Sequence, residues 1–469
     1  MARFVFLQDI LFDYLGPMYL SSALKARGHG CKLLVISEEK NLEEKLKKIS
    51  PDCILISTMT GPHKKYLGFI KELKKKFDIP VLMGGPHPTF FPEVLHHPEV
   101  DYICIGEGEE FIVDFADTLS SKKSFNKIAN LGYKRKGKLI YNPVRRLIEN
   151  LDTLPFPDRE LYYKSYPALA NQPTKRFLAT RGCPYNCSFC FNHALKQIYT
   201  NKGRYVRFRS PENIVKEILQ VKAKYPLRTV RFPDDSFTLN KKWLLELLSL
   251  YKKKVSLPFT CLGRANELDE EIVRALKEAN CLNIFFGIES GNERIRNKIL
   301  CKSLLDKDIV RATKLLKKYK ILFGTYNMIG LPGETLKEAL ETAKFNYKIG
   351  STLPTSTILQ PYPRTEIFDY SRKHGFLEKN FDVDNFEVMT AGSVLKMARK
   401  KEIINLNSFF FFAARFPFLI PLIKILIKLP PNSIFKFLSF ASMGWVRLRA
   451  QNITLLQGIK TAKRFLGKI

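Results

Sequence analysis

Short apolar runs alternate with stretches of helical periodicity along this chain, and the alternation restricts the fold more than any other feature. In the first segment the apolar runs cover residues 3–7, 31–37, 53–58, 80–85 and 102–108. They have the continuous hydrophobic character of strands buried on both faces, and helical stretches such as 61–77 separate them. The pattern predicts a doubly wound, Rossmann-like α/β domain with a parallel sheet over residues 1–125.

The carboxyl ends of these predicted strands carry small residues, namely Ser57, Thr58, Gly84, Gly85, Gly106 and Gly108. Ligands of such sheets lie beyond the carboxyl ends of the strands, and glycines there let a large flat ligand approach the backbone. A tight turn between strand and helix explains any single glycine equally well. The set as a whole favours a ligand-binding edge.

A turn-rich passage over residues 132–163 follows the first segment. It contains a hairpin signal around Arg135 to Lys138 and then an extended stretch with Pro155 and Pro157. We expect a linker over residues 126–173.

A second series of strands and helices begins near Thr174, with predicted strands at 176–181, 229–235, 259–265, 283–290, 322–330 and 355–363. Six such units predict a partial (β/α)6 barrel of the TIM type over residues 174–370, followed by a mostly helical region over 371–469. In barrels of this type, functional residues lie at the carboxyl ends of the strands. The polar residues at these predicted ends are Cys183, Asp234, Asp235, Arg264, Glu289 and Ser290.

Three cysteines stand within eight positions in RGCPYNCSFC (181–190), at Cys183, Cys187 and Cys190. Structural zinc requires four ligands, usually as two separated pairs, and no second pair with suitable spacing follows. A four-iron cluster can be held by three thiolates if its fourth iron is left for an exogenous ligand. Three unrelated thiols in one turn would be a rare coincidence, because only nine of 469 residues are cysteine.

Composition limits the environment and the partners. Nine cysteines are too few for a disulfide scaffold and the start of the chain does not resemble a signal peptide, so we expect a cytoplasmic protein. The formal charge of +32 predicts attraction to something anionic, either nucleic acid, a membrane surface or a phosphorylated substrate. Lysine-rich solvated helices are a common alternative source of such a charge.

The stretch CPYNCSFC (183–190) resembles the cluster motif of radical S-adenosylmethionine (SAM) enzymes, and residues 83–110 resemble the cobalamin-binding domain of one large subgroup of that family. The stretches NLDTLPFPDRELY, FPDDSFTLN, GRANELDEE, FFGIESGNERI and MIGLPGET also resemble this subgroup. The similarity runs from about residue 2 to about residue 370, in the order that the family shows.

The resemblance implies the cofactors and assigns residues to them. Cys183, Cys187 and Cys190 would ligate a [4Fe–4S] cluster whose unique iron chelates SAM. The residues implied to contact SAM are Phe189, Asp234, Arg264, Glu289, Ser290 and Gly330. The residues implied to contact cobalamin, between the two domains, are Ser57, Thr58, Gly84, Gly85, Gly106, Glu107 and Gly108. For Arg264 and Glu289, a salt bridge inside the barrel is an equally good interpretation.

The sequence departs from one cobalamin signature. None of the seven histidines stands two positions after an aspartate, as an Asp-x-His-x-x-Gly cobalt-binding motif requires. We therefore expect no protein histidine on the cobalt, and interpret His87 as a loop or packing residue.

The family chemistry implied is reductive cleavage of SAM, which needs an external electron donor of the flavodoxin or ferredoxin type. The resulting radical removes hydrogen from an unactivated carbon of the substrate, which then takes a methyl group from methylcobalamin. Methylation explains both cofactors and is our leading hypothesis. Ring formation, carbon–carbon joining and rearrangement remain alternatives, and a cobalamin sensor does not explain the three-cysteine loop.

The C-terminal region carries the only indication of a substrate. Residues 403–469 contain no acidic residue but ten basic ones, among long apolar stretches at 408–430 and 433–448. Charges and prolines interrupt the best window for a spanning helix, so we expect peripheral binding to the inner face of the membrane and a lipid or membrane-associated substrate. A helical cap over the open side of the barrel is the alternative. An RNA substrate is less favoured, because no small RNA-binding β-barrel follows the catalytic segment.

Overall fold

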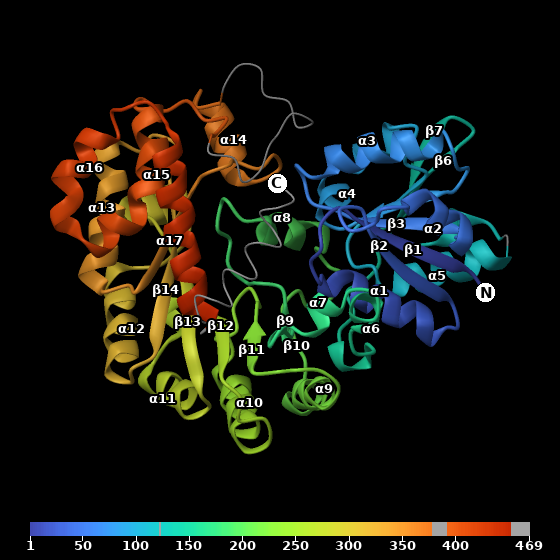
Figure 1. Ribbon diagram of the computed structural model, residues 1–469, viewed down its shortest axis with the longest axis horizontal. Helices are drawn as coiled ribbons and strands as arrows, with labels where there is room; N and C mark the ends of the chain where they lie inside the picture. Colours follow the sequence, from blue (N-terminus) through green and yellow to red (C-terminus); the bar gives the residue numbers. More distant parts are fainter. Residues whose placement is uncertain (122, 378–391, 452–469) are drawn as a thin grey trace. The chain divides into compact units, whose positions relative to one another are not determined.

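The computed structural model describes residues 1–121, 123–377 and 392–451. Their contacts divide these residues into two compact units (Figure 1). The first unit contains residues 1–172 and 195–207, and the second contains residues 173–194 and the described residues from Phe208 onward.

The sheet of the first unit has the strand order β2-β1-β3-β4-β5-β6-β7. Its strands are β1 (Arg3–Gln8), β2 (Gly30–Val35), β3 (Cys53–Ser57), β4 (Val81–Gly84), β5 (Tyr102–Cys104), β6 (Leu131–Arg135) and β7 (Lys138–Tyr141). The first five are parallel. The predicted doubly wound sheet is therefore confirmed, and its strand order reverses direction between β1 and β3, where ligands of such sheets lie.

Helices cover both faces of this sheet because successive side chains of a strand point to opposite faces. The helices are α1 (Leu15–Ala26), α2 (Leu42–Ile49), α3 (His63–Lys74), α4 (Pro86–Phe90) and α5 (Glu109–Ser121). Val5 and Leu7 of β1 pack with Leu46 of α2 and Ile70 of α3 in one core cluster. Helices α1 and α5 contact each other.

Residues 126–172, most of the range expected as a linker, are built into the first unit instead. The predicted hairpin forms with Lys136 and Gly137 in its turn, both at positive φ, and β6 adds antiparallel to the edge of β5. The short helices α6 (Glu160–Tyr163) and α7 (Pro167–Ala170) follow. Tyr162 on α6 is fully buried and donates a hydrogen bond of 2.7 Å to Gln8 at the end of β1. Burial of such aromatic side chains is what ties this stretch to the sheet.

The second unit contains a six-stranded parallel sheet with the order β15-β14-β13-β12-β11-β8. Its strands are β8 (Thr174–Arg176), β11 (Thr229–Phe232), β12 (Phe259–Leu262), β13 (Cys281–Glu289), β14 (Leu322–Ile329) and β15 (Leu353–Ile358). Neighbours in the chain are neighbours in the sheet, as in a TIM-type barrel that has not closed. A separate two-stranded sheet pairs β9 (Thr180–Arg181) with β10 (Arg207–Phe208).

Helices connect these strands and lie along the outer side of the sheet (Figure 1). They are α9 (Pro211–Lys224), α10 (Lys241–Lys254), α11 (Glu270–Glu278), α12 (Asp306–Lys318) and α13 (Leu336–Ile349). Helix α8 (Phe191–Ile198) follows β9, and α14 (Glu366–Lys373) follows β15. Helix α13 shows why they begin and end where they do. Thr335 and Glu338 form a reciprocal capping box at its start, and Gly350 in the left-handed conformation ends it.

The C-terminal region is helical, as predicted, over α15 (Lys400–Arg415), α16 (Ile420–Leu426) and α17 (Ser433–Gln451). Helix α15 packs against α13 and the edge strand β15, and α17 runs beside α15 (Figure 1). Ile403, Phe409 and Phe410 of α15 are buried in this contact. One face of the region thus caps the open edge of the barrel. In the described residues no helix combines the length and the apolar character needed to cross a bilayer.

Candidate active site

The three clustered cysteines lie on the loop after β9, between Arg181 and the start of α8. Gly182 opens this loop with a φ of +84°, a conformation that suits glycine. Ser188 anchors the loop, because its amide donates to the carbonyl of Leu300 at 3.0 Å and its hydroxyl donates to that of Ile299 at 2.7 Å. The loop is therefore fixed by the segment that follows β13.

The thiols of this loop are free and differ in exposure. Cys187 is buried, and Cys183 and Cys190 are half-buried. Burial raises the pKa of Cys183 to about 11 and also raises that of Cys190, with smaller contributions from neighbouring thiols. Within the described ranges no three His, Cys, Asp or Glu side chains stand close enough to hold a metal ion by themselves. The three thiols nevertheless belong to one short loop, and three is the number of thiolates that a cluster with an open iron needs.

Arg264, two residues after β12, lies directly beside the cysteine loop. Its guanidinium carbon stands 3.6 Å from the ring centre of Tyr185, and its Nη1 is 3.9 Å from the Sγ of Cys187. Its Nη2 donates to the carbonyl of Lys302, and its Nε donates to Asn266 at 2.8 Å. Arg264 thus places a fixed positive charge next to a thiol that would carry negative charge as a ligand.

Glu289 ends β13 with a φ of +61°, which is unusual for a residue other than glycine, and the register of β13 against β14 shifts here. Its carboxylate pairs with Lys302 at 2.9 Å, and both side chains are buried. Lys302 Nζ also stands 5.8 Å from the ring centre of Phe189 in the cysteine loop. Glu289 therefore forms a salt bridge inside the barrel, which was the alternative interpretation for it, whereas the partners of Arg264 described above are a ring, a thiol, an amide side chain and a backbone carbonyl.

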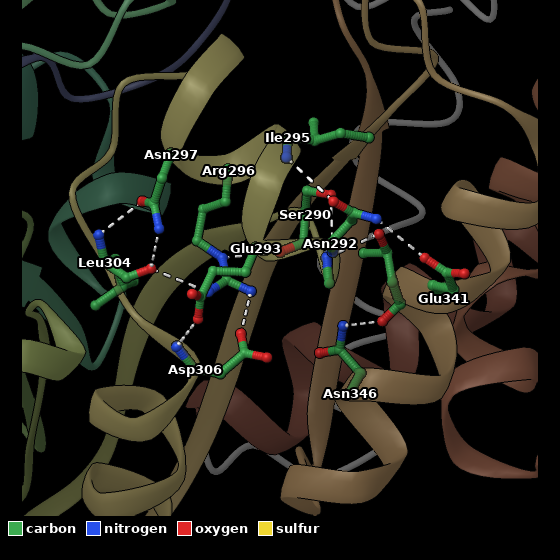
Figure 2. A network of polar contacts seen from close by, with 12 residues as sticks. Ser290, Asn292, Glu293, Ile295, Arg296, Asn297, Leu304, Asp306, Glu341 and Asn346 are labelled. Atoms are coloured by element: carbon green, nitrogen blue, oxygen red, sulfur yellow. Dashed lines mark hydrogen bonds and ion pairs between the residues drawn. The ribbon is translucent and has the colours of Figure 1, made fainter.

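Ser290 and the loop after it are held by one fully buried arginine (Figure 2). Arg296 donates to the carbonyls of Ser290 at 2.9 Å and Leu304 at 3.0 Å, and to the carboxylate of Asp306 at 2.8 Å. The hydroxyl of Ser290 accepts a hydrogen bond from the amide of Asn292 and is fully buried. This network sets the course of the chain that carries Lys302.

Asp234 at the end of β11 is directed at the strand before the cysteine loop. Its Oδ1 accepts hydrogen bonds from the amides of Ala179 and Thr180 at 2.8 and 2.5 Å, and from the Thr180 hydroxyl at 2.9 Å. Burial raises the pKa of Asp234 to about 7. The neighbouring Asp235 is exposed and receives a hydrogen bond from Asn192. Asp234 therefore shapes the strand end, whereas Asp235 lies close enough to the cysteine loop for its charge to contribute to the raised pKa of Cys183 and of Cys190.

The stretch IGLPGE (329–334) is closed by its own glutamate. Glu334 accepts hydrogen bonds from the amides of Gly330 at 2.7 Å and Leu331 at 3.2 Å. Burial raises the pKa of Glu334 to about 8. Gly330 has a φ of +73°, and a methyl group on it would stand 2.8 Å from Met397. The Glu334 carboxylate thus closes the turn, and Met397 leaves no room for a side chain at Gly330.

The small residues predicted at the strand ends of the first unit lie along one edge of its sheet. A methyl group on Gly85, at a φ of +91°, would stand 2.9 Å from both Ser57 Oγ and Thr58 O. A methyl group on Gly84 would meet only Cys104, at 3.7 Å. The backbone is therefore uncovered at Gly84 and tightly packed at Gly85, which fits a flat ligand that lies against the strand ends.

The loop of Gly106, Glu107 and Gly108 is braced by residues that the sequence analysis did not identify. Arg207 binds both carboxylate oxygens of Glu107, at 2.6 and 3.0 Å, and is buried. Tyr199 accepts a hydrogen bond from the Glu107 amide at 2.7 Å and occupies the space beside Gly106. Both residues follow the cysteine loop in sequence but belong to the first unit. Only their place just after the cluster motif could have drawn attention to them.

His87 lies inside the first unit and not at its surface. It is 2% exposed, its ring stacks on that of His63 with centroids 3.7 Å apart, and its Nδ1 is 3.1 Å from Thr60 Oγ1. Burial, with smaller effects of two other histidines, lowers the pKa of His87 to about 3. These contacts are those of a packing residue.

Comparison with known families assigns both units. Residues 12–116 match the B12 binding domain, and residues 177–345 match the radical SAM superfamily. The chain belongs to the radical SAM enzymes that carry a cobalamin-binding domain. Its cofactors are accordingly a [4Fe–4S] cluster, SAM and cobalamin.

Three curated relatives show the range of activities nearby. An uncharacterised methyltransferase of Pyrococcus horikoshii is 31% identical, over 77% of this chain and 79% of the relative. The anaerobic magnesium-protoporphyrin IX monomethyl ester cyclase of Rubrivivax gelatinosus is 24% identical, over 79% and 68%. The cytidylyl-2-hydroxyethylphosphonate methyltransferase of Streptomyces wedmorensis is 22% identical, over 83% and 82%.

A solved structure shares the fold of almost the whole chain. The cobalamin-dependent radical SAM enzyme OxsB, with aqua-cobalamin and SAM bound, aligns with a TM-score of 0.69 at 18% identity. The alignment covers 96% of this chain and 72% of OxsB.

Proposed function

We propose that this radical SAM enzyme is a C-methyltransferase that replaces a hydrogen on an unactivated carbon with a methyl group. The observation that carries the proposal is the combination, in one chain, of a three-thiol loop at the strand ends of a partial barrel and a glycine-lined edge on a second parallel sheet. Methyl transfer uses both cofactors that these two edges suit. Relatives named as methyltransferases in Pyrococcus horikoshii and Streptomyces wedmorensis support it.

When bound and reduced by an external donor, the cluster and SAM supply hydrogen abstraction, and cobalamin supplies the methyl group. The chain's own residues hold and orient these groups. Cys183, Cys187 and Cys190 are the cluster ligands, and Arg264 sets a positive charge against one of them. The Glu289–Lys302 pair and Phe189 form the wall beside the loop.

The remaining predicted contacts divide by what their side chains do. Asp234 and Ser290 use their polar atoms on the protein backbone, so we propose that they position the strand ends. Gly330 stands in a turn that Glu334 closes, where Met397 occupies the space that a side chain would need. Along the first sheet, Ser57, Thr58, Gly84, Gly85, Gly106, Glu107 and Gly108 form the proposed edge for cobalamin.

Methylation can be tested without knowing the substrate. Reconstituted enzyme is incubated anaerobically with reductant and SAM that carries a trideuteromethyl group, and the protein-bound cobalamin is extracted for mass spectrometry. We expect the label in the cobalamin and 5′-deoxyadenosine in solution. If 5′-deoxyadenosine forms but no label reaches cobalamin, the cyclase alternative suggested by the Rubrivivax gelatinosus relative replaces methylation.

The buried position of His87 supports our proposal that cobalt receives no protein histidine. The paramagnetic resonance spectrum of the cobalt(II) form should therefore show no nitrogen coupling from a protein histidine. Nitrogen coupling that is present in the wild type and disappears in His87→Ala would contradict this proposal.

A lipid or other membrane-associated substrate remains our prediction, and an RNA substrate the less favoured alternative. The support for a lipid comes from the C-terminal helices.

A further inference from the structure

The C-terminal helices carry an unusually dense set of exposed apolar side chains for the length of chain that they occupy. We call the exposed side chains of residues 416–449 the C-terminal surface. Among the described residues, ten of the nineteen large exposed hydrophobic side chains belong to it. The most exposed include Phe418 at 75%, Ile434 at 68%, Phe437 at 67% and Ile425 at 63%. Scattered apolar side chains are ordinary on a protein surface, but such a concentration marks an interaction site.

Helix α17 has two apolar faces, which a simple cap does not need. Phe435 and Val446 are buried against the rest of the unit. Ile434, Phe437 and Met443 are exposed, and Phe437 lies on the side of the helix opposite these two buried residues. A helix that only covers a core presents polar residues to water on its other side. The outward apolar face of α17 is therefore not explained by the cap.

The charges around this surface have one sign. Its exposed charged side chains are Lys424, Lys428, Lys436, Arg447 and Arg449. No acidic residue occurs anywhere in residues 403–469. The guanidinium of Arg449 lies 4.9 Å from the ring centre of the half-exposed Trp445. Aromatic, aliphatic and basic side chains are thus interleaved on one surface.

The partner that fits must be both anionic and apolar. A second copy of this surface would bring like charges together, and a nucleic acid would leave the aliphatic side chains without a partner. A bilayer with anionic headgroups satisfies both requirements. We propose that the C-terminal surface docks on an anionic membrane, with α16 and α17 lying in the plane of the interface. The docking does not depend on the proposed methylation.

The first test is flotation of the full-length holoenzyme with vesicles. It should rise with vesicles that contain phosphatidylglycerol and much less with pure phosphatidylcholine. Raising the salt concentration should weaken but not abolish binding, because salt screens the charges and leaves the apolar contact. Failure to float with anionic vesicles at low salt would overturn the proposal.

Two pairs of variants assign the binding to this surface. Lys424→Glu/Lys428→Glu/Lys436→Glu should lower affinity for anionic vesicles by about a hundredfold. The matched control Lys216→Glu/Lys253→Glu/Lys254→Glu changes the net charge equally on exposed residues of α9 and α10. Phe418→Ser/Phe437→Ser should remove the salt-resistant binding, whereas Tyr347→Ser/Leu322→Ser, also exposed, should not. If target and control variants lose binding equally, the assignment to this surface fails.

An independent measurement uses one of the two tryptophans. Trp243 is buried and donates to the Arg209 carbonyl, whereas Trp445 is 48% exposed. In Trp243→Phe the remaining emission of Trp445 should shift to shorter wavelength on addition of anionic vesicles and should be quenched by brominated lipid. An unchanged emission while the protein floats would place the contact elsewhere. A dimer that hides Trp445 without lipid would favour a second copy as the partner.

Discussion

The two sheets of this molecule present their carboxyl ends in opposite ways. In the second unit that edge carries side chains with chemistry of their own, three thiols, Arg264 and the Glu289–Lys302 pair. In the first unit it carries glycines and hydroxyls, with Glu107 turned onto Arg207. On our proposal, the edge of the second unit ligates a cluster and the edge of the first unit lies against cobalamin. The two cofactors should therefore be separable by mutation.

The largest effect is expected at the thiols. Cys183→Ala/Cys187→Ala/Cys190→Ala should lose all of about four irons per chain and all 5′-deoxyadenosine formation. It should still bind cobalamin, because no residue of the glycine-lined edge is changed. Iron analysis, visible absorbance and cobalamin titration measure the three quantities. Cys301→Ala, which removes an exposed thiol outside the motif, is the control and should keep the cluster.

If the triple-cysteine variant also lost cobalamin binding, the two cofactor sites would not be separable by mutation. Retained SAM cleavage would contradict the cluster assignment itself.

A variant of Gly85 should show the reverse effect, weaker cobalamin binding without loss of the cluster. In Gly85→Ala the new methyl group would collide with Ser57 and Thr58, so cobalamin should bind at least about tenfold more weakly while the iron content stays unchanged. Gly28→Ala is a matched control, since Gly28 has a similar φ of +80° but no atom within 4 Å of the added group. Equal losses in both variants would mean that backbone strain alone, and not the shape of the edge, explains the result.

The contrast between the two edges also explains which parts of the fold and of the candidate site could be predicted from the sequence alone. Thiols need a fixed spacing to hold a cluster, so CPYNCSFC was recognisable, whereas a glycine is compatible with many turns. The alternation of strands and helices predicted both sheets. The expected strand over 176–181 is interrupted, because the amides of Ala179 and Thr180 donate hydrogen bonds to the Asp234 carboxylate.

Other features depend on tertiary contacts that no local pattern encodes. Lys302 stands thirteen residues after Glu289, and its pairing requires the course of the loop that Arg296 fixes. Arg207 lies a hundred residues from Glu107. The range 126–172 has the prolines of a linker, but its tyrosines find partners in the first sheet, as the bond from Tyr162 to Gln8 shows.

Variants of the Arg207–Glu107 ion pair in the first unit should weaken cobalamin binding less than variants of the glycines at the same edge. Arg207→Lys keeps the charge but loses the two-point contact with Glu107, so cobalamin should bind about three- to fivefold more weakly. A cycle with Glu107→Gln, Arg207→Met and the double variant should give a coupling of about 1–3 kcal/mol in the free energy of cobalamin binding. Additive effects would show that the ion pair does not position the loop. The cluster content serves as the control, because neither residue belongs to the second unit.

The smallest expected effect is a pH dependence at the second edge, where two glutamates of one turn and helix shift in opposite directions. Burial raises the pKa of Glu334 to about 8, although amides of Leu331 and Gly330 oppose it. For Glu338 burial also acts upward, but hydrogen bonds from Thr335 lower the pKa below its usual value. Glu334 binds more protons in the folded state than in the unfolded state. Its contribution is present below about pH 4.5 and is lost as the pH rises through about 8.

Glu338 behaves in the opposite way, because its contribution is present above its unfolded pKa and is lost as the pH falls through its folded pKa. Glu334→Gln cannot ionise, so the melting temperature of this variant relative to wild type should rise by a few degrees between pH 5 and pH 8. Glu338→Gln should show no such rise. Thermal melts of both variants at the two pH values decide the matter, since parallel curves for Glu334→Gln and wild type would mean that Glu334 stays ionised in the fold. The Glu334 side chain would then accept the amide hydrogen bonds of Gly330 and Leu331 as a charged carboxylate and not as a protonated acid.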